Sequence, residues 1–147
     1  VVVTPCIVKP DSALTNARYP VSGSFIDISK YDRCAFLVHL GTIADTISFS
    51  VYADVTAAET GDIAAVTSAT YTLNANTDDG NYFLIEFSPA KVAALNTASL
   101  SYRYVTLVVA GNSGSNYAEI LFLGTHARSE PVTQSAYSIA HSIDLGG

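Results

Sequence analysis

The sequence predicts an all-β protein: a single antiparallel β-sandwich, jelly-roll-like, with one short helix and an extended arm at each end. Three observations lead to this fold class. Residues 46–54 alternate between apolar and polar side chains, as a strand does when one face lies on a core and the other in water. Apolar or alternating runs recur at the spacing of sandwich strands. Strands do not alternate with long helices, so a parallel α/β sheet is not expected.

The first half of the sandwich is expected to contain three strands before a mixed segment. Residues 25–29 form a short strand, and the polar turn at 30–33 leads into an apolar strand at 34–40. In the alternating strand 46–54, one set of side chains faces the core: Ile47, Phe49, Val51 and Ala53. The segment 57–67 is expected as a loop with a short helical turn.

The second half is expected to contain four further strands and the helix. The strands are placed at 69–73, 82–87, 102–110 and 117–124. The helix begins after Ser88, which can cap it, with Pro89 at the first helical position, and runs to Leu95. The Gly- and Asn-rich residues 111–116 are expected to join the last two strands in a hairpin.

A chain of 147 residues fits one domain that can bury a core without metals or disulfides. We place the β-sandwich domain at 25–124, the N-terminal arm at 1–24 and the C-terminal arm at 125–147. The prolines of the first arm would confine any strand there to a sheet edge. The arm either pairs with a neighbouring subunit or packs on its own domain.

The arms hold the residues that we expect to contact another protein subunit. These residues are Val1, Val2, Val3, Ile7, Val8, Val132, Tyr137, Ile139 and Ile143.

The charge balance excludes one large class of partner. The net charge is −6, and the seven Lys and Arg residues are scattered singly, whereas nucleic-acid binding needs a basic patch. Charged residues make up only 14% of the chain, which favours a surface partly covered by protein partners. No apolar run reaches the length of a membrane span, so neither nucleic acid nor membrane is expected as a partner.

The residue types that carry chemistry do not assemble into a site. His39, His126 and His141 share no metal-ligand spacing. Asp78, Asp79 and Asn81 invite a calcium interpretation, but Asp-Gly-Asn is ordinary turn chemistry.

A possible acid–base group, formed by Asp27, Asp32, Arg33 and Glu86, is better explained by a local ion pair or an Asx-turn. Cys34 is expected in the core, and a bridge between Cys6 and Cys34 remains open. The sequence therefore predicts no catalytic residue, no metal site and no cofactor.

Three segments resemble virion proteins of tailed bacteriophages, specifically small β-sandwich capsid decoration, or cement, proteins. They are residues 25–33 (FIDISKYDR), 102–107 (YRYVTL) and 124–132 (GTHARSEPV). In that group the order is DIS-x-YDR, then RYV, then a tail with AR-x-x-PV, and the similarity covers the chain from about Phe25 to Val132.

The resemblance implies a non-enzymatic protein on the outer surface of a phage head, assembled in the host cytoplasm. It also implies the major capsid protein as partner, contacted through the arm residues named above, and a homo-oligomer, often a trimer. The acidic charge agrees with an outer position, because packaged DNA would repel it. Two alternatives stay open: a phage tail structural protein, and a carbohydrate- or receptor-binding β-sandwich that uses the abundant tyrosines.

Overall fold

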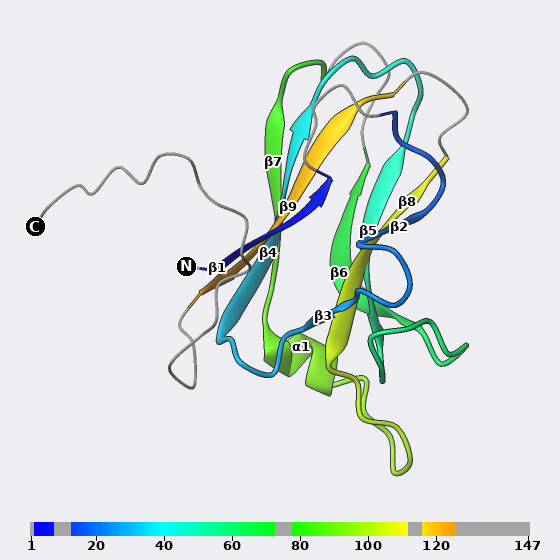
Figure 1. Ribbon diagram of the computed structural model, residues 1–147, viewed down its shortest axis with the longest axis vertical. Helices are drawn as coiled ribbons and strands as arrows, with labels where there is room; N and C mark the ends of the chain where they lie inside the picture. Colours follow the sequence, from blue (N-terminus) through cyan, green and yellow to red (C-terminus); the bar gives the residue numbers. More distant parts are fainter. Residues whose placement is uncertain (1, 8–12, 73–77, 112–115, 126–147) are drawn as a thin grey trace, which may run out of the picture.

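The structure is a computed structural model that describes residues 2–7, 13–72, 78–111 and 116–125. Within these ranges the chain forms nine strands and one short helix (Figure 1). The strands are β1 (Val2–Ile7), β2 (Arg18–Tyr19), β3 (Ile26–Asp27), β4 (Arg33–Leu40), β5 (Ser48–Asp54), β6 (Ala64–Thr72), β7 (Tyr82–Phe87), β8 (Tyr104–Ala110) and β9 (Ala118–Thr125), and the helix is α1 (Pro89–Ala93).

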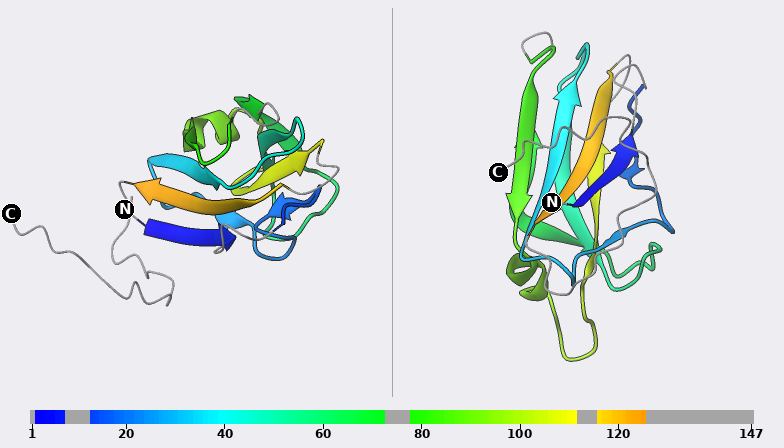
Figure 2. Two further views of the ribbon diagram at one scale, coloured as in Figure 1. Left: turned by 90° about the horizontal axis from the view of Figure 1, so that it is seen from above. Right: turned by 60° about the vertical axis from the view of Figure 1, so that its left-hand side comes forward.

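The strands form two antiparallel sheets. One has four strands in the order β1-β9-β4-β7, and the other has the order β2-β8-β5-β6, with β3 also paired to β8. In Figure 1 the four-stranded sheet lies on the left and the five-stranded sheet on the right, and Figure 2 turns the same ribbon to show the two layers. The all-β prediction, with antiparallel sheets and one short helix, is confirmed.

One hydrophobic core lies between the two sheets. The four-stranded sheet contributes Phe36 and Phe122, the five-stranded sheet contributes Phe49 and Leu107, and none of these four side chains is exposed. The ring of Phe49 packs edge-on against Phe83 of β7, with 5.3 Å between the centroids. These contacts join the inner faces of both sheets, and the alternation predicted for β5 is the pattern that places its apolar side chains there.

The helix and most of the strands lie where the sequence places them. Ser88 caps α1: its side chain accepts a hydrogen bond from the backbone N–H of Lys91 at 3.4 Å, and Pro89 occupies the first turn. β7 has the expected bounds, while the expected strand at 69–73 begins earlier, at Ala64. The segment 57–67 therefore ends in a strand, and β6 pairs with β5 across a register shift between Ser50 and Tyr52.

The hairpin expected from the last two strands is not formed. β8 pairs with β5, β2 and β3, whereas β9 pairs with β1 and β4 in the other sheet. Both strands are central in their sheets, and each contributes apolar side chains to the buried core. The chain therefore passes from one sheet to the other between these strands, and Asn116, just before β9, is fully buried.

The described N-terminal residues pack on their own domain, the second of the two alternatives considered for this arm. β1 pairs with β9 of the same molecule, and Leu14 is buried in the core. Of the contact residues expected here, Val2, Val3 and Ile7 lie in β1, and Val1 and Val8 lie outside the described residues. β1 is an edge strand, as its Pro5 predicts. Proline has no backbone N–H to donate to a neighbouring strand, so within sheets it is confined to edges.

The expected C-terminal contact residues, Val132, Tyr137, Ile139 and Ile143, lie outside the described residues. Their assignment to a capsid or subunit contact therefore stays a prediction.

Candidate protein-binding face

The outer face of the four-stranded sheet is unusually apolar. Strand register places Val3 beside Leu123, Leu123 beside Ala35, and Ala35 beside Glu86 in one row across the sheet. The next row on this face places Leu121 beside Leu37 and Leu37 beside Leu84. We call this surface the leucine face; its residues are Val3, Ala35, Leu37, Leu84, Leu121 and Leu123.

Two residues of the leucine face are well exposed: Leu84 at 45% and Val3 at 37%. The other leucines are half-buried. Large exposed apolar surface marks contact with other molecules more often than isolated exposed leucines do. The face also differs from the outer face of the five-stranded sheet, where β5 presents Ser48, Ser50 and Tyr52.

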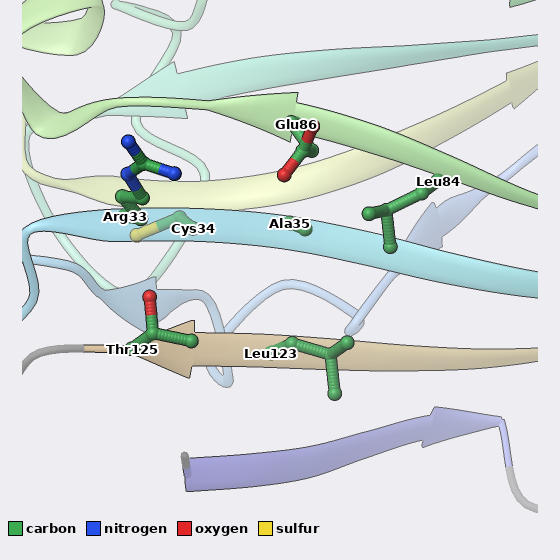
Figure 3. A pocket seen from close by; sticks show the side chains of 7 residues that line it. All are labelled: Arg33, Cys34, Ala35, Leu84, Glu86, Leu123 and Thr125. Atoms are coloured by element: carbon green, nitrogen blue, oxygen red, sulfur yellow. The ribbon is translucent and has the colours of Figure 1, made fainter.

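A hollow opens in the leucine face where Ala35 lies. Its volume is about 470 Å³, and it is lined by Arg33, Cys34, Ala35, Leu84, Glu86, Leu123 and Thr125. Figure 3 shows that these residues come from three adjacent strands, β4, β7 and β9. The small Ala35 side chain, 7% exposed, lies between the larger Leu123 and Glu86 in its row. An apolar side chain from a partner would fit a hollow of this kind.

Charged and polar groups border the hollow on one side. Arg33 pairs in register with Thr125 at one end of the sheet, and Glu86 lies beside Ala35 on the edge strand β7. The surface thus has an apolar centre with polar groups at its border, as protein interfaces do.

The other end of the leucine face carries an aromatic pair. The rings of His39 and Tyr82 stack with 4.0 Å between centroids and an angle of 3°. Glu119 lies beside them, with its Oε2 3.7 Å from His39 Nδ1. Tyr82 is 65% exposed. His39 thus lies on the outer face, opposite Cys34 and Phe36, as its position in the strand predicts.

The tyrosines that could offer stacking surfaces differ in how exposed they are. Tyr31 and Tyr102 are buried, at 7% and 9% exposure, so neither can stack on a ligand. Tyr52 and Tyr117 are half-buried, and Tyr71 stacks on Phe83. Among the described tyrosines that were candidates, Tyr82 has the most accessible ring.

The acidic residues singled out in the sequence have structural roles. Asp79 Oδ1 accepts a hydrogen bond from the backbone N–H of Ile43 at 2.8 Å, which ties the turn before β7 to the loop after β4. Asp27 Oδ1 accepts from the N–H of Ser29 at 2.9 Å, an Asx-turn, and its Oδ2 lies 3.3 Å from Nη2 of Arg103. Among the described residues, no three His, Cys, Asp or Glu side chains lie together as a metal site would require.

Asp27 pairs with Arg103, whereas the group considered from the sequence contained Arg33. Arg103 also donates from Nη2 to the hydroxyl of Tyr104 at 2.8 Å. The hydrogen bond to Tyr104, and then the Asp27 carboxylate, raise the pKa of Arg103. Of the other residues considered with Asp27, Asp32 donates its backbone N–H to the carbonyl of Thr125 at 3.2 Å, and Arg33 and Glu86 line the hollow.

No disulfide joins Cys6 and Cys34; Cys34 lies in the core and Cys6 packs at its border. Burial raises the pKa of the Cys6 thiol to about 12 from the ordinary 9.0. The thiolate is the reactive form, so at a given pH near neutrality its fraction falls about a thousandfold.

We therefore expect neither thiol of the native protein to react appreciably with a disulfide reagent at pH 8. After unfolding in guanidinium, both should react promptly, and the Cys6→Ser variant should lose one of the two reacting thiols. If one thiol of the native protein reacts promptly and this reaction is absent in Cys6→Ser, the packing of Cys6 against the core and its raised pKa are contradicted.

Sequence reasoning placed the candidate contacts in the two arms and missed the leucine face. A signal was present: the strand residues 34–38 and 120–123 are apolar at successive positions, which indicates that both faces of a strand are covered.

Comparisons with protein-family models, with curated proteins and with solved structures gave no match to this chain. The part of the chain that the structure describes contains no helix long and apolar enough to cross a membrane.

Proposed function

We propose that this chain is a structural protein of a bacteriophage virion, which binds the outer surface of the head and decorates or cements the capsid without catalysis. The observation that carries the proposal is the leucine face, an exposed apolar surface on a regular sheet with a polar rim. A face of this composition favours contact with other protein subunits. The partners that we propose are the major capsid protein and further copies of this chain.

The strand order supports the same proposal. Strands one, nine, four and seven form one sheet, and strands two, eight, five and six form the other. We take this connectivity to be a jelly roll, the double Greek key that occurs in viral capsid proteins and also in lectins. Because one fold serves many functions, the strand order favours a virion protein only together with the leucine face and the sequence resemblance.

Two of the segments that resemble phage proteins contact each other. The backbone N–H of Ile28 donates to the carbonyl of Arg103 at 2.9 Å, and Asp27 pairs with Tyr104 in register and with the Arg103 side chain as an ion pair. The third segment ends outside the described residues. The two contacting segments therefore fix one corner of the fold, which is a structural role and agrees with a protein that acts by binding.

The aromatic pair His39–Tyr82 beside Glu119 favours a second candidate, carbohydrate or receptor binding. An exposed ring offers an apolar surface, and a neighbouring carboxylate could accept hydrogen bonds from hydroxyl groups. We place this candidate second because one accessible ring covers little ligand surface, whereas the leucine face extends over four strands.

The virion proposal is tested by adding purified protein to phage heads that lack it and measuring occupancy by electron microscopy. From occupancy over a concentration series, we expect Leu84→Glu to raise the Kd for the heads at least tenfold, which corresponds to about 1.4 kcal/mol. The physical reason is that the contact then loses the burial of a leucine, about 2 kcal/mol, and must accommodate a carboxylate.

The matched control is Thr72→Glu, at an exposed position of β6 in the other sheet. This variant should bind like the parent chain, and both variants should unfold within a few degrees of it. If the parent protein binds no particle, or binds only tails, the head-decoration proposal is wrong. Equal binding by both variants would remove the leucine face from the contact.

A further inference from the structure

We propose that the leucine face and its hollow are covered by the C-terminal segment of a second copy of this chain, residues 137–145, laid across the sheet as an extended strand. The inference builds on the proposed function in one respect, that copies of the chain are neighbours. It goes further by naming the occupant of the face and the side chains that would enter it.

The segment has the pattern that such an occupant needs. Apolar side chains recur at every second position except one, which is a histidine, and small or acidic residues lie between them. The first set is Tyr137, Ile139, His141, Ile143 and Leu145, and the second set is Ser138, Ala140, Ser142 and Asp144. Alternation with period two predicts a strand with one apolar face and one polar face.

The dimensions of the segment and the sheet agree. Nine residues in extended conformation span about 30 Å, and the eight residues of β4 span about 26 Å. The apolar side of the segment would thus reach along the whole leucine face, with one side chain available for the hollow at Ala35.

The point at which the chain leaves the sheet favours a neighbour as the recipient. β9 ends at Thr125, which itself lines the hollow, so the segment would have to reverse direction to lie on its own face. Such a reversal has to be made within residues 126–136, which contain no Gly, Asn or Asp; Ser129, Pro131 and Ser135 are the turn-forming residue types there. Their one proline, Pro131, biases Glu130 toward extended backbone.

The charges complement each other as well. Arg33 lies beside the hollow at the end of the sheet (Figure 3). Asp144 follows directly after Ile143, so a segment that anchors Ile143 near the hollow places a carboxylate close to this guanidinium. An arginine and a carboxylate can form a bidentate pair, which would fix the register of the segment on the face.

This arrangement is head-to-tail, because each copy gives a segment and receives one on a different surface. Such contacts form a closed ring when the rotation between copies closes. The trimer predicted from the sequence is one ring of this kind.

The first test measures the mass of the isolated full-length protein by sedimentation, in the absence of particles. We expect a closed oligomer for the parent chain, conversion of Ile139→Asp to monomer, and retention of the oligomer in Ser138→Asp. These two variants add the same charge at adjacent positions on opposite sides of the segment. A monomeric parent chain, or the same mass for both variants, would overturn the proposal.

The second test locates the segment directly. A nitroxide is attached at Ser142→Cys, where the buried Cys34 and the poorly ionised Cys6 should not compete for the label. This chain, without isotope, is mixed with ¹⁵N-labelled parent chain and allowed to exchange subunits. Amide peaks of Ala35, Leu84 and Leu123 should lose most of their intensity, whereas those of β6 should keep theirs.

Loss of intensity only when the nitroxide and the isotope are in the same chain would show that each face is covered by its own segment, and would overturn the assignment to a second copy. No loss at the leucine face in either sample would overturn the occupant altogether. Because both tests use the isolated protein, they can fail while the protein still binds phage heads, and they can succeed if it does not.

Discussion

Replacing Gly124 by alanine is expected to destabilise the fold by about 2–3 kcal/mol, the cost of overpacking a well-packed core. A Cβ atom at this position would lie 2.6 Å from two ring carbons of Tyr31. The ring cannot move aside easily, because Tyr31 is only 7% exposed and also packs against Phe122 at 5.7 Å between centroids. The measurement is the free energy of unfolding from denaturant titration followed by circular dichroism.

A double-mutant cycle provides the control. Tyr31→Leu removes the ring, so Gly124→Ala should cost much less in that background, and the coupling energy should exceed 1 kcal/mol in magnitude, as contacting residues show. If Gly124→Ala costs the same with and without the tyrosine ring, its effect does not arise from this contact. The tyrosine of the YDR segment is thus a core residue that requires glycine opposite.

The sequence predicts individual elements well because each depends on neighbours along the chain. The alternation of Ile47, Phe49, Val51 and Ala53 corresponds to side chains that are 1% exposed or less. The cap by Ser88 and the position of Pro89 are likewise local, and both are as expected. Local patterns of this kind determine whether a segment is a strand or a helix and which of its faces is buried.

Which strands pair with each other cannot be predicted from such local patterns. β8 and β9 look like a hairpin because they are adjacent in sequence and joined by glycine-rich residues, yet each is central in a different sheet. A period of two defines the faces of a strand and leaves open which neighbour it pairs with. The same holds for β1: the sequence leaves open whether this segment pairs with a neighbouring subunit or with its own domain, and its pairing with β9 decides for its own domain.

One part of the leucine face can be predicted from local sequence, and another part depends on strand pairing. That β4 and β9 are apolar at successive positions is visible in the sequence, since Leu121 and Leu123 interleave with buried Ile120 and Phe122. The hollow is not visible, because it depends on Ala35 lying between residues that are about 50 and 90 positions away in the sequence and on the register of three strands.

Asp54 departs from the alternation of its strand because its carboxylate accepts hydrogen bonds from the loop that follows. It occupies a polar position of β5 yet is fully buried. Its Oδ1 accepts hydrogen bonds from the N–H of Val55 at 2.7 Å and of Thr56 at 3.2 Å, and from the hydroxyl of Thr60 at 2.9 Å. Its Oδ2 accepts from the N–H of Thr60 at 3.2 Å. One carboxylate thus organises the loop that follows the strand.

Replacing Asp54 by alanine is therefore expected to destabilise the protein by about 3 kcal/mol, since several donors lose a charged acceptor and buried N–H groups without partners are costly. Asp54→Asn keeps one acceptor oxygen and should cost clearly less. Asp62→Ala, an exposed position in the same loop, is the matched control and should change the free energy of unfolding by less than about 0.5 kcal/mol. Hydrogen exchange should locate the damage, with faster exchange in Asp54→Ala at the amides of Val55, Thr56 and Thr60. Equal stability of the Asp54→Ala and Asp62→Ala variants would mean that the loop does not depend on this carboxylate.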